Sequence, residues 1–379
     1  MRIDRLLMCL LLMSGSLAGC AAPEGSLSPS PELPDANATR TPFLTESKSP
    51  ATASETPTPG ASEKASLAPT TTPTPSLRVN LEAVGDMMLA RTVGDQVQAR
   101  GPGIVFAGVQ SVFNSADVLV GNLECALTSG GQPQHKIYTL AAPPETARAL
   151  ALAGFDVLSL ANNHAMDYGS QGMFETRLNL GQVGIGSVGA GANAAEAHTP
   201  VILERNGLRL AFLAYVDVPV EKGGFDAHSW IASGTQPGIA WATPDQIKLD
   251  VTAAKAQADV VIVQLHTGYE INAYIPSVSE NQREEARAAI DAGAALVIGS
   301  HPHVLQTIEQ YHGGLIAYSL GNFVFDEYDG IANATIILRV VLTRAGVESY
   351  DWVPVLIENG LPRLATNLEV PAIGTMVAP

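Results

Sequence analysis

Residues 294–303 read A-A-L-V-I-G-S-H-P-H, an apolar run that ends in a glycine, a serine and two histidines around a proline. An apolar run without alternation predicts a strand buried on both faces, and such strands belong in a sheet covered by helices. The chain has eight histidines, so two of them at one strand end need an explanation. Either Pro302 directs a turn that exposes two imidazoles, or His301 and His303 are ligands.

The same pattern recurs from residue 78 to residue 360, which we predict to be one folded domain. Apolar runs alternate with amphipathic segments, which predicts an α/β fold of alternating strands and helices. The predicted strands are residues 81–84, 118–120, 157–160, 260–265, 296–298 and 315–320. The predicted helices are residues 144–153, 172–182, 244–258 and 280–292, with Thr243 and Ser279 opening the last two. Residues 335–343 and 347–357 predict two antiparallel strands, at the edge of the sheet or in a second sheet.

Polar residues follow each of the six predicted strands. Sites in parallel α/β sheets form beyond the carboxyl ends of the strands, so we expect these side chains at one edge. They are Asp86, Asn122, Glu124, Asn162, Asn163, His164, His266, His301, His303 and Asn322. Taken singly, Asp86 and the asparagines are typical of turns and caps, and His266 of a hydrogen-bonded core position. Their combination favours a site.

The residue types indicate metal chemistry. Imidazole together with carboxylate and carboxamide oxygens suits Mn, Fe or Zn, singly or as a pair of ions. Two ions about 3.5–4 Å apart can activate a nucleophile and neutralise charge on a phosphoryl or acyl oxygen. Pro302 fixes the local backbone, so that His301 and His303 can project in set directions.

The N-terminal residues predict export. Arg2 and Arg5, the apolar residues 6–13 and the small residues after them form the layout of a signal peptide over residues 1–19. Residues 17–20, L-A-G-C, resemble a bacterial lipobox, in which cleavage precedes a cysteine that carries lipid. The alternative is an ordinary secretory signal with an incidental Cys20. We therefore expect an extracytoplasmic bacterial lipoprotein, anchored in the membrane by lipid at Cys20.

Two further segments flank the predicted domain. Residues 20–77 are dominated by Pro, Ser, Thr, Ala and Glu, which cannot bury a core, so we predict a flexible stalk. Residues 361–379 are predicted to be a C-terminal tail. Because Cys9 would leave with the signal and Cys20 would carry lipid, no disulfide is expected for Cys125. Its thiol could bind a soft metal beside Glu124, but a small buried thiol is the favoured interpretation.

The charge balance limits the partners. The chain has 21 basic and 37 acidic residues and a formal net charge of −16. This argues against nucleic acid or an anionic bilayer as the main binding partner. An acidic protein that handles an anionic substrate needs local positive charge, and bound metal ions supply it.

Six motifs together resemble a known family. They are GDMMLAR, GNLE, LANNHAMDYG, HTGYE, GSHPHV and YSLGNFVF, between residues 85 and 325. The set resembles the CapA family of capsule or poly-γ-glutamate biosynthesis proteins, which is similar in fold to the calcineurin-like metallophosphoesterases. The resemblance implies a four-layer αββα sandwich of the metallo-dependent phosphatase type, with two sheets between outer helices.

The resemblance also implies roles for residues. The implied metal ligands are Asp86, Glu124, Asn163, His266, His301 and His303. His266 and His301 would complete one metal position, and His303 with Asp86 the other. His164 would be the acid that protonates a leaving group. Asn122, Asn162, Glu270 and Asn322 would support the ligands or contact substrate.

Three positions depart from the pattern of these families. Met88 replaces the histidine of the phosphoesterase D-x-H motif, Glu124 replaces a bridging aspartate, and Thr267 stands where an aromatic residue is common. One metal position thus loses a ligand, so the site could hold one ion or two.

Three hypotheses for function follow. The first is a lipid-anchored metal-dependent hydrolase that takes part in making or processing an anionic capsule polymer such as poly-γ-glutamate. The second is a non-catalytic accessory protein that binds the nascent polymer or a membrane synthase complex, as the loss of a histidine at Met88 suggests. The third, a solute-binding lipoprotein, explains the anchor and the stalk but not the histidines.

Overall fold

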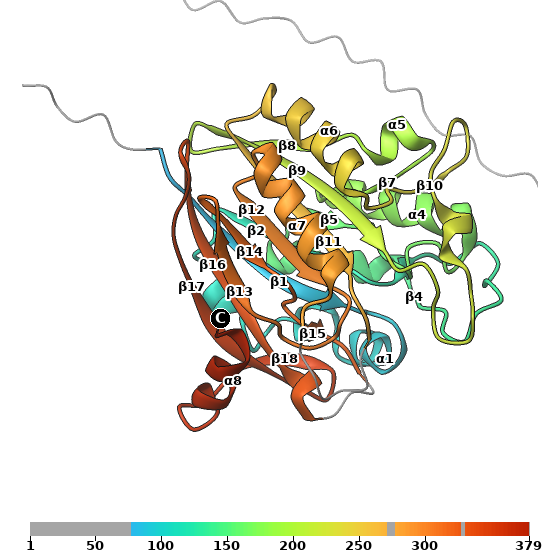
Figure 1. Ribbon diagram of the computed structural model, residues 1–379. Coiled ribbons are helices and arrows are strands. Elements are labelled where there is room, and N and C mark those ends of the chain that lie inside the picture. Colours follow the sequence, from blue (N-terminus) through green and yellow to red (C-terminus); the bar gives the residue numbers. More distant parts are fainter. Residues whose placement is uncertain (1–76, 271–276, 327–329, 379) are drawn as a thin grey trace, which may run out of the picture. The chain divides into compact units, whose positions relative to one another are not determined.

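Two β-sheets lie at the centre of the protein in the computed structural model, which describes residues 77–270, 277–326 and 330–378 (Figure 1). The predicted signal peptide, Cys20 and all but the last residue of the predicted stalk lie outside the described residues. None of the helices in the described ranges is long and apolar enough to cross a membrane.

The larger sheet has eight strands in the order β18-β17-β16-β1-β2-β5-β6, and β15 also pairs with β1. Its strands are β1 (Val79–Met87), β2 (Val118–Leu123), β5 (Val157–Ser159), β6 (Gly186–Val188), β15 (Asn322–Val324), β16 (Ala334–Thr343), β17 (Gly346–Glu358) and β18 (Leu361–Leu364). β1, β2, β5 and β6 run parallel, whereas β16 and β17 form the antiparallel pair that the sequence predicts.

The smaller sheet has six strands in the order β13-β14-β12-β11-β9-β8. They are β8 (Val201–Arg205), β9 (Leu208–Asp217), β11 (Val260–Thr267), β12 (Leu296–Ser300), β13 (Ile308–Tyr311) and β14 (Gly314–Ala317). β9, β11, β12 and β14 run parallel. The six strands that the sequence predicts for one edge are therefore divided between two sheets, and that part of the prediction is wrong.

Alternate residues of β9 face different layers. Leu210 and Phe212 belong to the core that contains residues of both sheets, whereas Leu213 and Tyr215 pack in a second core with the helices α6 and α7. The longer helices are α1 (Arg91–Arg100), α3 (Ala147–Ala153), α4 (Gly169–Gln182), α6 (Pro244–Lys255), α7 (Glu280–Ala292) and α8 (Val370–Val377). Figure 1 shows α6 and α7 over the smaller sheet, and α4 packs beside β6 of the larger one. The four-layer α/β sandwich is confirmed.

Local sequence explains where the predicted helices begin. The side chain of Thr243 accepts a hydrogen bond from the backbone of Gln246 at the start of α6. Ser279 and Gln282 form a capping box at the start of α7, which satisfies two backbone donors at once. The shorter elements are α2 (Gln110–Phe113), α5 (Ala194–Ala197), β3 (Ala126–Leu127), β4 (Ala141–Ala142), β7 (Ala190–Gly191) and β10 (Gly238–Ile239).

The segment predicted as a C-terminal tail contributes to the fold. β18 pairs with β17 in the larger sheet, and α8 buries Ile373 and Val377 in the core. The domain thus extends beyond the predicted boundary at residue 360, because β18 adds a short third strand to the antiparallel pair at the free edge of β17.

Candidate metal centre

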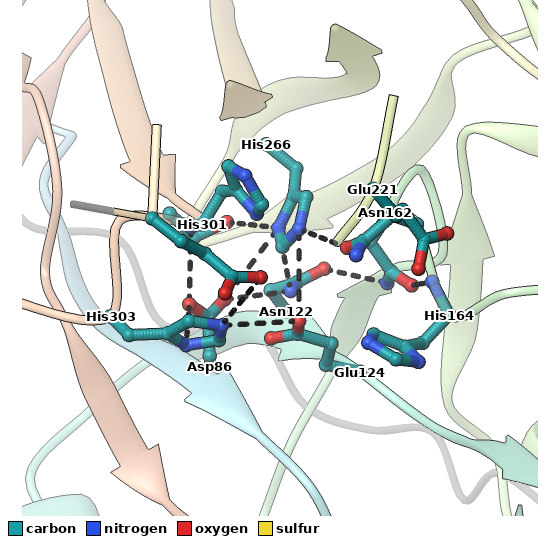
Figure 2. Close-up of polar contacts among 12 residues, drawn as sticks. Asp86, Asn122, Glu124, Asn162, His164, Glu221, His266, His301 and His303 are labelled. Atoms are coloured by element: carbon teal, nitrogen blue, oxygen red, sulfur yellow. Dashed lines mark hydrogen bonds and ion pairs between the residues drawn. The ribbon is translucent and has the colours of Figure 1, made fainter. Parts of the chain in front are cut away.

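The site lies where the carboxyl ends of strands from both sheets meet (Figure 2). Asp86 at the end of β1 pairs in register with Asn122 of β2 and with Asn322 of β15. His266 at the end of β11 pairs with Ser300 of β12. The loops after β2, β5, β11 and β12 carry the remaining predicted residues. They are Glu124, Asn162, Asn163, His164, Glu270, His301 and His303.

Two glycines beside the site let neighbouring segments of backbone approach closely. A Cβ atom on Gly85 would lie 1.9 Å from the carbonyl oxygen of Gly321, and one on Gly299 would lie 1.9 Å from that of Tyr318. No side chain fits at either position, so β1 can pass Gly321 and β12 can pass Tyr318 this closely only because residues 85 and 299 are glycines.

The two histidines around Pro302 have unusual backbones. His301 has a φ of 96° and His303 a φ of 57°, in the region that residues other than glycine rarely adopt. Such conformations cost about 1–3 kcal/mol each and gather at functional sites. The chain therefore holds both imidazoles in place against local strain.

Two carboxylates are fully buried in the site. Asp86 accepts hydrogen bonds from Asn122 Nδ2 (2.8 Å) and from the backbone of His301 (3.1 Å). Neither carboxylate oxygen of Glu124 has a hydrogen-bond partner among the described residues. Burial, followed by the negative charges of Asp86 and Glu270, holds the pKa of Glu124 well above its ordinary value. A carboxyl group buried in this way takes up a proton unless a cation compensates its charge, and a bound metal ion would provide that compensation.

The three histidines are buried as well. Burial, and then the neighbouring imidazoles, hold the pKa values of His266 and His301 well below the ordinary value. Both rings are therefore neutral at neutral pH, which is the form that binds metal. Nδ1 of His301 has no hydrogen-bond partner in the part of the chain that the structure describes.

The donors form two groups, and both fit a divalent cation. One donor atom from each of Asp86, Glu124 and His266 lies within 4.8 Å of the others, and the same holds for Glu270, His301 and His303. Neutral imidazoles beside uncompensated carboxylates are suited to the borderline ions Mn, Fe and Zn. This grouping differs from the implied pairs, because His266 and His301 belong to different groups.

Asp86 and Asn163 connect the donors. Oδ1 of Asp86 lies 3.7 Å from His266 Nδ1, and its Oδ2 lies 3.5 Å from His303 Nδ1, so this carboxylate stands between the two groups. Oδ1 of Asn163 lies 2.8 Å from His266 Nε2. Figure 2 shows the side chains of Asp86, His266 and His303 converging on the same place.

Two sulfur-containing residues, Met88 and Cys125, do not belong to either donor group. Sδ of Met88 accepts a hydrogen bond from the backbone of Ala90 (3.1 Å), and the side chain is buried in the core. Cys125 accepts a bond from the backbone of Leu89, and burial raises its pKa to about 12. Cys125 therefore remains a thiol, in agreement with the favoured interpretation.

Residues 80–327 match the family described as bacterial capsule synthesis protein PGA_cap, a span of more than half the chain that contains every predicted site residue except Cys20. The chain belongs to the PGA_cap family. The "PGA biosynthesis protein CapA" of Bacillus subtilis is 34% identical over 74% of this chain and 72% of the relative. The "Capsule biosynthesis protein CapA" of Bacillus anthracis is 35% identical over 76% of this chain and 70% of the relative.

Solved structures are more distant from this PGA_cap protein. A novel phosphatase from Mycoplasma pneumoniae is 11% identical, and the match covers 74% of this chain and 94% of that one, with a TM-score of 0.45.

Three asparagines of the PGA_cap protein support the donors. Asn122 Nδ2 bonds to Asp86, and its Oδ1 accepts a bond from Asn162 Nδ2 at 3.0 Å. Asn322 Oδ1 lies 2.8 Å from His303 Nδ1. Such hydrogen bonds fix the orientation of ligands around a metal.

A buried charge network behind His164 was not predicted. Nδ1 of His164 lies 2.7 Å from Asp167 Oδ2, and Nζ of Lys136 lies 2.7 Å from Asp167 Oδ1. Lys136, whose side chain is 0% exposed, also reaches Glu221 and the backbone oxygen of Asn163, both at 2.6 Å. Asp167 stands in the LANNHAMDYG motif, three residues after His164, and that spacing could have revealed it. Lys136 carries no comparable signal in this PGA_cap sequence.

Proposed function

We propose that this protein is a metal-dependent hydrolase that takes part in making or processing an anionic capsule polymer such as poly-γ-glutamate. The supporting observation is the set of fully buried carboxylates and neutral imidazoles, in which Glu124 has no hydrogen-bond partner among the described residues. The printed names of the two relatives, a PGA biosynthesis protein and a capsule biosynthesis protein, support the choice of polymer.

The residues that would hold the ions are Asp86, Glu124, Asn163, His266, His301 and His303. A bound Mn, Fe or Zn ion supplies a Lewis acid for the scissile group and an activated water nucleophile. In a protein with a net charge of −16, the ions also supply the local positive charge that an anionic substrate needs.

His164 would deliver the proton to the leaving group. Its Nδ1 donates to Asp167, which leaves Nε2 to carry and release the catalytic proton. The carboxylate of Asp167 orients the imidazole, and Lys136 holds that carboxylate in place. Asn162 Oδ1 accepts a hydrogen bond from the backbone of His164 at 3.0 Å and so fixes the loop.

The function is tested with γ-glutamyl and phosphoester substrates in the presence of Mn²⁺. We expect turnover by the wild-type protein and a loss of about 10²–10⁴-fold in His164→Asn, with the bound metal unchanged. Equal turnover by both proteins would remove His164 from the mechanism. A wild-type protein that binds metal and turns over none of these substrates would instead favour the second candidate.

The second candidate is an accessory protein that binds the nascent polymer or a membrane synthase complex. Met88 favours it, because this residue supplies no ligand at a position where the phosphoesterase motif has a histidine. Direct binding of oligo-γ-glutamate without turnover would support it.

In either role the protein is proposed to act outside the cytoplasm, anchored by lipid at Cys20. Metabolic labelling with a palmitate analogue tests this directly. Label is expected on the wild-type chain and is lost in Cys20→Ser, whereas label on both proteins contradicts the assignment.

A further inference from the structure

We propose that Glu270 is a metal ligand and that, together with His301 and His303, it builds a second metal position without any contribution from residue 88. This inference rests on the proposed metal centre, but it does not depend on which bond is hydrolysed.

Met88 is unsuited to the role that its place in the motif implies. Its sulfur accepts a hydrogen bond from the backbone of Ala90, and its side chain is 0% exposed within the apolar core. A thioether is also a weak ligand for Mn, Fe or Zn ions. A second ion therefore needs a donor from elsewhere in the chain.

Glu270 supplies a donor on the open side of the site. Its Oε1 lies 3.9 Å from Nε2 of His303, and its side chain is 45% exposed. β11 ends at Thr267, and Gly268 then takes a φ of 110°, where an added Cβ would lie 2.6 Å from the side chain of Gln282. This turn, which only glycine fits, directs the chain from His266 to Glu270.

The hydrogen bonds of His303 set which nitrogen faces Glu270. Nδ2 of Asn322 donates to the backbone oxygens of His303 and Ala332, so Oδ1 of Asn322 is the atom that accepts from His303 Nδ1. Nδ1 is thereby held as a hydrogen-bond donor. The other ring nitrogen, Nε2, lies 3.8 Å from Glu124 Oε1 and 3.9 Å from Glu270 Oε1 and is the atom that can bind an ion.

His301 provides a further observation that points to a ligand here. It is 3% exposed, and its Nδ1 has no hydrogen-bond partner among the described residues. One donor atom from each of His301, His303 and Glu270 falls within 4.8 Å of the others. An imidazole nitrogen that is buried and unsatisfied beside a second imidazole and a carboxylate fits a borderline divalent ion.

The two positions differ in exposure. Asp86, Glu124 and His266 are all buried, whereas Glu270 is the one exposed member of the two donor groups. The ion beside Glu270 is therefore the outer one, and we expect it to exchange with solvent before the inner one.

The test is Mn²⁺ titration of the full metal-free chain, followed by calorimetry and by electron paramagnetic resonance. Wild-type protein is expected to bind two ions with a spin-coupled spectrum. Glu270→Gln, which removes one charge from an exposed side chain, is expected to bind the outer ion at least about tenfold more weakly and to lose the coupling. Glu284→Gln makes the same change on the exposed surface of α7 and is the matched control.

Each outcome bears on the proposal. An unchanged stoichiometry and coupling in Glu270→Gln overturns it, as does a wild-type protein that binds one ion or none. Two ions in the wild-type chain and one in the variant support it, even if no substrate is turned over. If the ions bind in this way but no substrate is turned over, the ligand assignment stands and the proposed hydrolase function fails.

Discussion

The backbone nitrogen of His301 donates a hydrogen bond to Oδ2 of Asp86 at 3.1 Å, and this bond links two sheets. Asp86 is the last residue but one of β1 in the larger sheet, and His301 follows β12 in the smaller one. The same two residues supply donors to the candidate metal centre. Metal binding and the contact between the sheets are therefore coupled at this point.

Replacing Glu124 by Gln is expected to stabilise the metal-free protein and to weaken its binding of metal. The substitution removes a carboxyl group whose ionisation is disfavoured in the folded protein by burial and by Asp86 and Glu270, and which no hydrogen bond compensates. In EDTA the free energy of unfolding of the variant should exceed that of the wild type by on the order of 1–3 kcal/mol, as measured by urea denaturation. With added Mn²⁺ the wild-type Tm should rise and that of the variant should stay nearly constant. A variant that is destabilised in EDTA would contradict this account of Glu124.

Replacing Lys136 by Met is expected to destabilise the fold by about 3–5 kcal/mol, because it leaves the buried carboxylate of Asp167 and that of Glu221 without their cation. Urea denaturation measures the loss. Lys222→Met, at an exposed lysine, is the control and should shift stability by no more than about 0.5 kcal/mol. Equal losses of stability in the two variants would show that the buried network does not contribute to the stability of the fold.

Replacing Gly299 by Ala should cost at least about 2 kcal/mol of stability, since the new methyl group would lie 1.9 Å from the carbonyl oxygen of Tyr318 and would push β12 away from β14. The affinity for Mn²⁺ should fall as well, because His301 and His303 come soon after residue 299 and would move with β12. Gly103→Ala is the matched control, since no atom lies within 4 Å of its added Cβ. Equal stabilities of the Gly299→Ala and Gly103→Ala variants would contradict this prediction.

Replacing Glu285 by Gln should remove a pH dependence of stability. Burial, and then the charge of Asp217, raise the pKa of Glu285 to about 8. The folded protein thus keeps a proton that the unfolded chain releases above its ordinary carboxyl pKa, so this contribution to stability is present at low pH and is lost as the pH rises toward 8. The free energy of unfolding of the variant should exceed that of the wild type by on the order of 2–4 kcal/mol at pH 8, and the two should be equal near pH 4.5. Parallel stability curves between these pH values would contradict the assignment.

The residues of the site could be predicted because they lie at or just after the end of an apolar run, as Asp86 and His266 are the last residues but one of β1 and β11. The division into two sheets could not be predicted from that spacing. A strand that is apolar on both faces, such as β12, fits equally well in either sheet, and its partners are decided by contacts distant in sequence.

One missed element did carry a signal. β8 and β9 are joined by Asn206 and Gly207, which have φ values of 49° and 79°. Asn-Gly between two apolar runs is the strongest short-range indication of a hairpin, and it would have predicted both strands. Lys136 had no such indication, because its partners Asp167 and Glu221 lie 31 and 85 residues away and only the fold brings them together.

The candidate site is a metal centre only if ions bind between the donors of the two sheets. Anomalous diffraction at the zinc edge, from crystals of the protein grown with Zn²⁺, measures this. We predict a peak about 2.0–2.2 Å from donor atoms of Asp86 and His266, and a second beside His303 and Glu270. A crystal with no anomalous peak among Asp86, Glu124 and His266 would contradict the central claim.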